Sequence, residues 1–154
     1  MEDLRDLTEA RVEIERIALS RSIALGDLEW ETNLVAAWHR LSKISKQLPE
    51  SQQGLEQWAN AHAGFHLALV AACGSNKLLQ IRFQLYEQSD RYRRYSGVVA
   101  RERNVFAEHQ RIFNATIGRD AATATDEMAK HLRLTAEVIT DSLLQDDGRR
   151  ERAS

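Results

Sequence analysis

The stretch 55–73, with the sequence LEQWANAHAGFHLALVAAC, decides the fold. Its apolar residues return every three or four positions, which is the spacing of one buried stripe on an α-helix. Histidine occupies two positions of this stripe, His62 and His66, four residues apart. Residues at this spacing lie one turn above each other, with Cβ atoms about 5–6 Å apart, so both imidazoles can reach one point. This is ligand spacing for a single metal ion.

The rest of the chain repeats the helical period. It holds one proline and seven glycines among 154 residues, and no stretch alternates apolar and polar side chains as a half-buried strand does. The pattern predicts one all-α domain over residues 1–154, an antiparallel bundle of about six helices with short connections. The expected helices, with their capping residues, span 3–25, 27–48, 55–72, 76–96, 102–117 and 120–144.

Residues that stop or cap helices mark these boundaries. Gly26 is expected to end the first helix in a left-handed cap, and Pro49 is expected to end the second. Three side chains are predicted N-caps because they can accept from the first turn: Asp27, Asn76 and Asp120. The segment 49–54 is a polar connector, a looser stretch surrounds Gly97, and the charged tail 145–154 is expected to fray.

Composition excludes several classes of protein. The longest apolar run is far shorter than the about 20 residues that span a bilayer, and the N-terminus lacks the basic start of a secretory signal. We therefore expect a cytoplasmic protein with no membrane partner. The formal net charge is −2, with 21 basic and 23 acidic side chains, so this chain alone is not expected to hold DNA. The basic stretch 91–95, RYRRY, is interpreted as a solvated helix face.

Two further histidines take the place of apolar residues on inward stripes, His109 in 102–117 and His131 in 120–144. The fifth, His39, lies at the edge of its stripe and is expected to be exposed. A lone inward histidine is more often a hydrogen-bonded core residue than a ligand, and a metal-free bundle stays open as an alternative. Four inward rings favour a shared metal, because each uncoordinated buried imidazole risks an unsatisfied nitrogen at about 1–3 kcal/mol.

Arg11 interrupts the apolar stripe of the first helix, on which Leu25 is also expected to be buried. Arginine is rarely buried without a partner, and its planar fork suits a carboxylate. Arg11 is therefore a candidate for binding an acidic effector. The alternatives are a salt bridge with Glu15, one turn along, or snorkelling to the surface. Arg93 is a weaker second candidate for the same role.

Three segments carry a family resemblance: FHLALVAACGSNKLL at 65–79, EHQRIFNATIGRD at 108–120 and KHL at 130–132. They resemble the ligand-sensing C-terminal (FCD) domain of GntR-type transcription regulators, FadR subfamily. The segment EARVEIERIA at 9–18 looks like the opening helix of that domain, so the resemblance covers nearly the whole chain. It implies an antiparallel helical bundle, usually a homodimer, that senses small organic acids. Many members hold a metal through one aspartate and three histidines.

Carried over residue by residue, the three family histidines match His66, His109 and His131, and His62 stands where the family has its aspartate. This departure leaves a neutral set of four nitrogens, which favours Zn²⁺, Ni²⁺ or Cu²⁺ over Mn²⁺ or Mg²⁺. Zinc is the expected metal because it is the most available, with nickel second. If the site keeps an open position, the ion and Arg11 together are expected to bind the carboxylate of an effector.

The resemblance also implies a winged helix-turn-helix domain ahead of the sensor, and nothing in this chain corresponds to one. DNA is thus expected as a partner only through a separate N-terminal domain, with this chain an excised sensor or a natural stand-alone version. The alternative function is a metal-dependent hydrolase or lyase on the same histidines. It is disfavoured because Glu56 falls off the stripe and Glu108 lies about 100° from His109 on an ideal helix. We therefore do not expect an enzyme.

Overall fold

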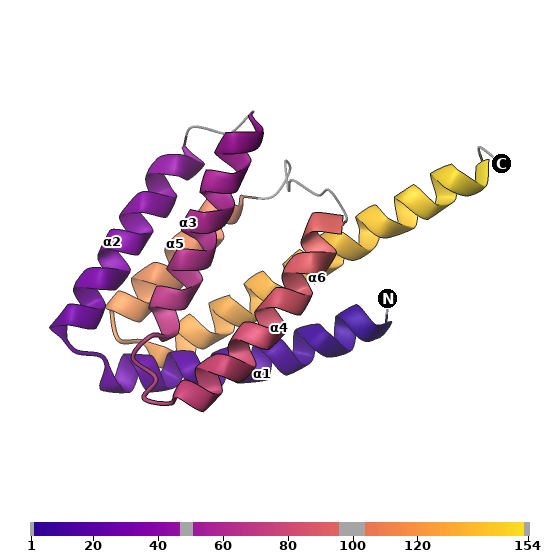
Figure 1. Ribbon diagram of the computed structural model, residues 1–154. Helices are drawn as coiled ribbons and strands as arrows, with labels where there is room; N and C mark the ends of the chain where they lie inside the picture. The colour runs from indigo at the N-terminus through magenta and orange to yellow at the C-terminus, as the bar shows by residue number, and fades with distance from the viewer. Residues whose placement is uncertain (1, 47–50, 96–103, 153–154) are drawn as a thin grey trace.

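Six α-helices make up the described part of the chain (Figure 1). The computed structural model describes residues 2–46, 51–95 and 104–152, with side chains described for 2–46, 51–93 and 104–145. The helices are α1 Glu2–Leu25, α2 Leu28–Ser45, α3 Gln52–Val70, α4 Asn76–Tyr95, α5 Val105–Ile117 and α6 Ala121–Arg152. Within those ranges no strand occurs, and no helix combines the length and apolar character that crossing a bilayer demands. The predicted all-α helical bundle is confirmed.

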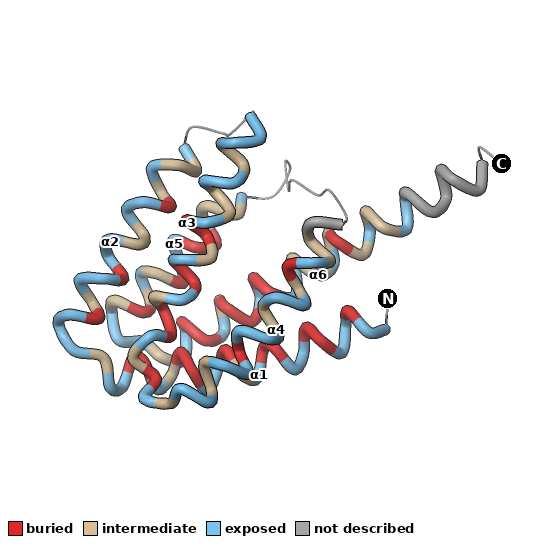
Figure 2. The backbone as a smooth tube through the Cα atoms, in the orientation of Figure 1, coloured by how far each residue is buried: buried red, intermediate tan, exposed pale blue. Residues whose placement is uncertain are grey.

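The helices pack in neighbouring pairs. Helices α2 and α3 stand side by side, while α1 runs along α6 and is also covered by α4 and α3 (Figure 1). Helix α5 lies between α6 and α2. Buried positions follow the inward faces of these helices (Figure 2). The largest apolar side chains of the core are Leu19, Leu34, Leu41, Phe65, Leu69, Ile112 and Met128. Each contributes about 1.5–3 kcal/mol by leaving water.

One apolar residue departs from the predicted core. Leu25 is 60% exposed, although it continues the stripe of α1. It is the last residue of that helix, and the chain turns away at Gly26 before another turn could cover it. The expectation that Leu25 is buried is therefore wrong.

Side-chain oxygens cap the helices, as their positions predict. Asp27 accepts from the amide of the third residue of α2 at 2.9 Å, and Asp120 does the same for α6 at 3.0 Å. Both predicted N-caps are confirmed. The prediction for Asn76 is wrong by one residue, because the Ser75 hydroxyl accepts from the amide of the third helical residue, Leu78, at 3.2 Å. A serine oxygen reaches that amide as well as an asparagine oxygen would.

Gly26 ends α1, but the predicted left-handed cap is wrong. Among the described residues only Gly74, at φ 69°, and Arg119, at φ 58°, have positive φ. Glycine is needed at position 26 for space, since a Cβ there would lie 2.1 Å from Cε3 of the Trp30 ring. The start of α2 therefore folds back onto the end of α1 at a distance that only glycine allows.

Several helix boundaries differ from the prediction by two residues or more. Helix α3 begins at Gln52, ahead of the expected residue 55, with Ser51 as its N-cap. Helix α6 continues to Arg152, so the expectation that 145–154 frays is wrong for 145–152. That segment, QDDGRRER, holds three arginines, which favour a helix, beside two aspartates and a glycine, which do not. Helix α2 ends at Ser45 instead of about 48, α3 ends at Val70 instead of about 72, and α5 begins at Val105, after its N-cap Asn104, instead of about 102. The residues Leu48, Pro49, Ser96, Gly97 and Glu102, on which predicted boundaries fall, lie outside the described residues.

Candidate metal centre

Two ligand candidates lie on α3, one turn apart. His62 and His66 are both buried, and their ring centroids are 4.5 Å apart. The apolar stripe of α3 therefore places both imidazoles in the interior of the protein, as predicted. His66 is fully enclosed, at 0% exposure, in contact with the Phe65 ring beside it.

His109 on α5 and His131 on α6 complete the cluster. The Nε2 atoms of His66 and His109 are 3.2 Å apart, and the ring centroids of His109 and His131 are 4.5 Å apart. One ring nitrogen from each of the four histidines lies within 4.8 Å of the other three. The predicted convergence of four imidazoles is confirmed, and His39 is exposed as predicted.

Burial favours the uncharged form of the His62 and His66 rings. The pKa of His62 and of His66 is lowered well below 6.5, chiefly because burial removes water from the charged form and then because neighbouring rings and arginines repel it. Neutral imidazole offers a lone pair, which is the form that binds a metal. At neutral pH, protons therefore compete little with a metal for the lone pairs of the His62 and His66 rings.

The distances between the ring nitrogens are compatible with a bound metal ion. Zinc–nitrogen bonds of about 2.0–2.1 Å set ligand atoms about 3.3 Å apart in a tetrahedron and up to about 4.2 Å apart across an octahedron. The 3.2 Å contact between His66 and His109 and the 4.8 Å limit of the cluster are close to these values. Nδ1 of His62 and Nδ1 of His66 are buried without a hydrogen-bond partner among the described residues. The four histidines lie close enough to hold a metal ion.

Glu108 is a buried acid, although the helical pattern predicts that it faces away from the histidines. It is 7% exposed, and its Oε2 lies 2.9 Å from Nδ1 of His131. The expectation that no acid faces the histidines is therefore wrong. An ideal helical step takes Glu108 off the stripe of His109, but α5 packs against both α6 and α2 and so buries a wider arc. Because Nδ1 of His131 faces the carboxylate, Glu108 fixes the orientation of the His131 ring.

Arg11 is buried in the contact between α1 and α4, at 9% exposure, so the predicted inward position is confirmed and snorkelling is not observed. The charge of Arg11 also helps to lower the pKa of His66, although burial and the neighbouring histidines lower that pKa more. The alternative salt bridge is present, with Nη2 of Arg11 3.7 Å from Oε1 of Glu15. Burial lowers the pKa of Arg11, but arginine keeps its charge in proteins. Arg93, the second candidate, pairs with Asp90 on its own helix at 3.0 Å.

Comparison with known proteins agrees with this arrangement. The model of the FCD domain matches residues 6–134, which include Arg11 and all four clustered histidines. The chain belongs to the FCD domain family. The resemblance seen in the sequence is thus confirmed.

Two relatives of this FCD domain are larger proteins. Over 141 residues, 90% of this chain, it is 35% identical to the uncharacterized HTH-type transcriptional regulator BphR of Paraburkholderia xenovorans (strain LB400), of which it covers 58%. Over 147 residues, 92% of this chain, it is 34% identical to the HTH-type transcriptional repressor GlaR of Escherichia coli (strain K12), of which it covers 66%. The chain therefore spans less than two thirds of either relative.

His62 stands in this FCD domain where the resemblance implies an aspartate, and its ring is held firmly. The Trp58 ring stacks on it with centroids 4.8 Å apart and planes 18° apart. Nε1 of Trp58 donates to the Ser45 hydroxyl of α2 at 3.1 Å. The Arg93 guanidinium lies 5.8 Å from the centre of the Trp58 ring, on the α4 side. Three helices thus fix the orientation of the imidazole that departs from the family pattern.

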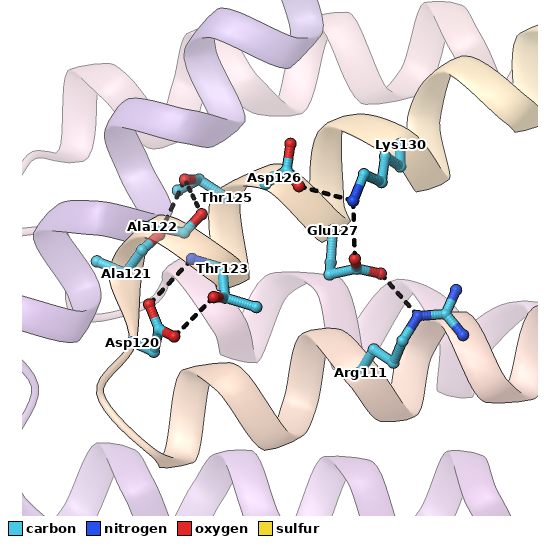
Figure 3. A network of polar contacts seen from close by, with 9 residues as sticks. All are labelled: Arg111, Asp120, Ala121, Ala122, Thr123, Thr125, Asp126, Glu127 and Lys130. Carbon is cyan, nitrogen blue, oxygen red and sulfur yellow. Dashed lines mark hydrogen bonds and ion pairs between the residues drawn. The ribbon is translucent and has the colours of Figure 1, made fainter.

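A polar network joins the two helices that carry His109 and His131 (Figure 3). Nε of Arg111 on α5 donates to Oε2 of Glu127 on α6 at 2.7 Å, and Nζ of Lys130 donates to Oε1 of the same carboxylate at 3.1 Å. Each exposed pair contributes little to stability by itself. The network links the surfaces of α5 and α6 close to His109 and His131 in the sequence.

Proposed function

We propose that this FCD domain is the effector-sensing and dimerising part of a GntR-type transcription regulator that works in the bacterial cytoplasm. The observation that carries the proposal is the four-histidine cluster beside a buried arginine, Arg11. Similarity to two HTH-type regulators supports it, and both are longer than this chain. DNA would be bound by a separate N-terminal domain, and a homodimer would bring two such domains together.

His62, His66, His109 and His131 would hold a divalent transition metal, zinc in the first place and nickel in the second. Four neutral imidazoles favour these ions, whereas Mg²⁺ and Mn²⁺ prefer oxygen. Bound there, the ion would supply an uncompensated double positive charge within the bundle, which attracts an anion. The protein's own part is to keep the rings neutral by burial and to orient His131 through Glu108.

Arg11 would take a carboxylate of a small organic acid. Its guanidinium is planar, always charged and able to form two parallel hydrogen bonds with a carboxylate. Nε of Arg11 is buried without a hydrogen-bond partner among the described residues. A buried donor without a partner costs about 1–3 kcal/mol, which an acid bound at Arg11 would offset.

Binding would be transmitted as a difference in affinity between two arrangements of the dimer. An effector can shift DNA binding only by the free energy with which it prefers one arrangement, typically about 1–3 kcal/mol. Helix α1 is the element that would carry this shift, because it holds Arg11 and packs against α3, α4 and α6.

A hydrolase or lyase on the same histidines is less well supported. Such enzymes need a general base on the open side of the metal. Glu108 is a buried acid beside the cluster, but its carboxylate meets Nδ1 of His131, so the imidazole ring stands between it and the other histidines. We therefore infer a binding domain without catalytic activity.

Metal analysis of the purified chain, followed by thermal shift with dicarboxylates and hydroxy acids, tests the proposal. We expect about one metal ion per chain and an acid-induced rise in Tm that disappears when a chelator removes the metal. The exposed His39 offers a matched control, since His39→Ala should change neither result. Protein without metal would favour a metal-free structural bundle. Acid-induced stabilisation that survives metal removal would contradict the metal's role in sensing.

A further inference from the structure

Three charged side chains are buried together where α1 meets α4. Glu15 and Arg11 come from α1 and Arg82 from α4, and their exposures are 0%, 9% and 3%. Buried charges are costly unless they are paired. Here one carboxylate serves two guanidiniums, so this cluster keeps a net charge of +1 inside the protein. We call these three residues the α1–α4 charge cluster.

The carboxylate is shared unequally. Nε of Arg82 donates to Oε2 of Glu15 at 3.1 Å, while Oε1, 3.0 Å from the same nitrogen, forms an ion pair with it but has no hydrogen-bond partner among the described residues. Nη2 of Arg11 stays 3.7 Å from Oε1, too far for a hydrogen bond. Both guanidiniums lie near the Tyr86 ring, at 5.0 Å for Arg11 and 5.6 Å for Arg82. Glu15 is thus bound to the arginine of the other helix rather than to the arginine one turn away.

This choice of partner is not what the local sequence favours. Arg11 and Glu15 stand four residues apart on one helix, a spacing at which opposite charges pair. In a buried site such a pair would form charge-assisted hydrogen bonds. An arginine engaged in that way would have to break them before it could bind another carboxylate.

We propose that Arg82 is a positioning residue for acid sensing: by holding the Glu15 carboxylate, it leaves the Arg11 guanidinium available to the carboxylate of an effector. The inference rests on the proposed function of Arg11 as the effector-binding residue. Arg82 itself does not touch the effector. The net +1 charge of the cluster selects an anion over a neutral molecule of similar shape.

Four variants of the full chain test this, with acetate as the smallest carboxylate probe, titrated by NMR into zinc-loaded protein while the Arg11 Nε–H signal is followed. Arg82→Met should weaken acetate binding by about tenfold, because Glu15 then closes on Arg11. The double variant Arg82→Met with Glu15→Gln should restore affinity to within about threefold of wild type, since no carboxylate competes. Glu15→Gln alone should bind acetate more tightly than wild type. Arg133→Met is the matched control, because Arg133 also joins α1 to another helix through a glutamate, Glu9, but at the surface.

The Arg11 signal before acetate is added separates the possible failures. In Arg82→Met it should move as Glu15 engages the guanidinium, and in the double variant it should return. If it stays at its wild-type position in Arg82→Met and acetate binds as in wild type, the positioning role is overturned. If acetate never moves the Arg11 signal in any variant, the proposed binding of acids by Arg11 is overturned, and this inference with it. Should Arg82→Met not fold, the Arg11 signal of Glu15→Gln before acetate is added still tests the inference: a signal near its wild-type position supports it, and a signal that moves as a hydrogen bond is lost shows that Glu15 already engages Arg11 and overturns it.

Discussion

The two polar clusters buried in this bundle are stable for opposite reasons. In the histidine cluster on α3, α5 and α6, burial lowers the pKa of His62 and of His66 and so favours their neutral form. The α1–α4 charge cluster stays charged, because two arginines flank one glutamate. Neutral imidazoles present lone pairs, which attract a cation, whereas a guanidinium presents only donors, which attract an anion. The Arg11 charge acts on the pKa of His62 and His66, and in the function proposed above the first cluster would hold the metal and the second the carboxylate.

The largest effect is expected from a variant that disrupts the histidine cluster and leaves the α1–α4 charge cluster intact. His66→Ala removes the most deeply buried ring, so bound metal should fall from stoichiometric to background and the free energy of unfolding should drop by at least about 2 kcal/mol. Metal analysis and urea unfolding measure both. His39→Ala, at the surface, should match wild type. Unchanged metal content and stability in His66→Ala would remove the cluster from any ligand role.

Acid should weaken the histidine cluster when no metal is bound. The pKa of His62 and His66 is lowered in the fold, whereas the unfolded chain keeps values near 6.5. As the pH falls below about 6.5, the unfolded chain takes up protons first, so stability is greatest above that pH and is lost below it, by up to about 1.4 kcal/mol per pH unit for each ring. Urea unfolding of chelator-treated protein from about pH 7.5 to 5.5 measures this. Saturating zinc should move the loss to lower pH, and a flat profile without metal would contradict the neutral, buried state.

Glu108→Gln should damage metal binding without removing a ligand. The carboxylate orients His131 through Nδ1, and loss of such a partner typically costs about 10–100-fold in metal affinity. Competition with a calibrated chelator measures the affinity. Glu127→Gln is a matched control on the same pair of helices, since Glu127 contacts Arg111 and Lys130 at the surface. Equal zinc affinity in Glu108→Gln and wild type would show that the acid only fills space.

Arg11→Ala should distinguish the roles of the two clusters, because it should weaken acid binding and leave metal binding unchanged. It removes the guanidinium proposed to bind the acid, so acid affinity should fall by about tenfold or more while metal content stays stoichiometric. Calorimetric titration of zinc-loaded protein with the acid that gives the largest thermal shift measures this. Arg16→Ala, an exposed arginine on the same helix, is the control. Equal affinity in Arg11→Ala and wild type would take Arg11 out of the site.

The same contrast explains what could be predicted from the sequence. His62 and His66 stand one turn apart, so helical periodicity alone places them together, and the stripes of His109 and His131 point inward for the same reason. The helices, the caps at Asp27 and Asp120 and the buried Arg11 follow from equally local patterns. All of these depend on residues within about four positions of each other.

The features that sequence missed depend on contacts between distant segments. Arg82 lies 67 residues from Glu15, and periodicity gives no sign that α4 would bring them together. Glu108 appears outward on a single helix and becomes buried only because α5 is packed on two sides. In each case a second helix, rather than the local pattern, decides what the side chain does.

The smallest expected effect tests how much burial adds to the strength of an ion pair. Helix α1 forms an exposed ion pair with α6 and a buried one with α4, and the two can be compared. Arg133 of α6 donates to Glu9 of α1 at 2.8 and 2.6 Å, yet both side chains are about half exposed. Arg133→Met should therefore change the free energy of unfolding by less than about 1 kcal/mol, and added salt should erase the difference since solvent ions screen exposed charges. Arg82→Met leaves Glu15 to pair with Arg11, so it should cost about 1–3 kcal/mol, the value of a lost buried hydrogen bond to a charged group, and keep most of that cost in high salt. Urea unfolding of both variants at low and high salt compares them, and equal losses would mean that the α1–α4 charge cluster is as well hydrated as the surface.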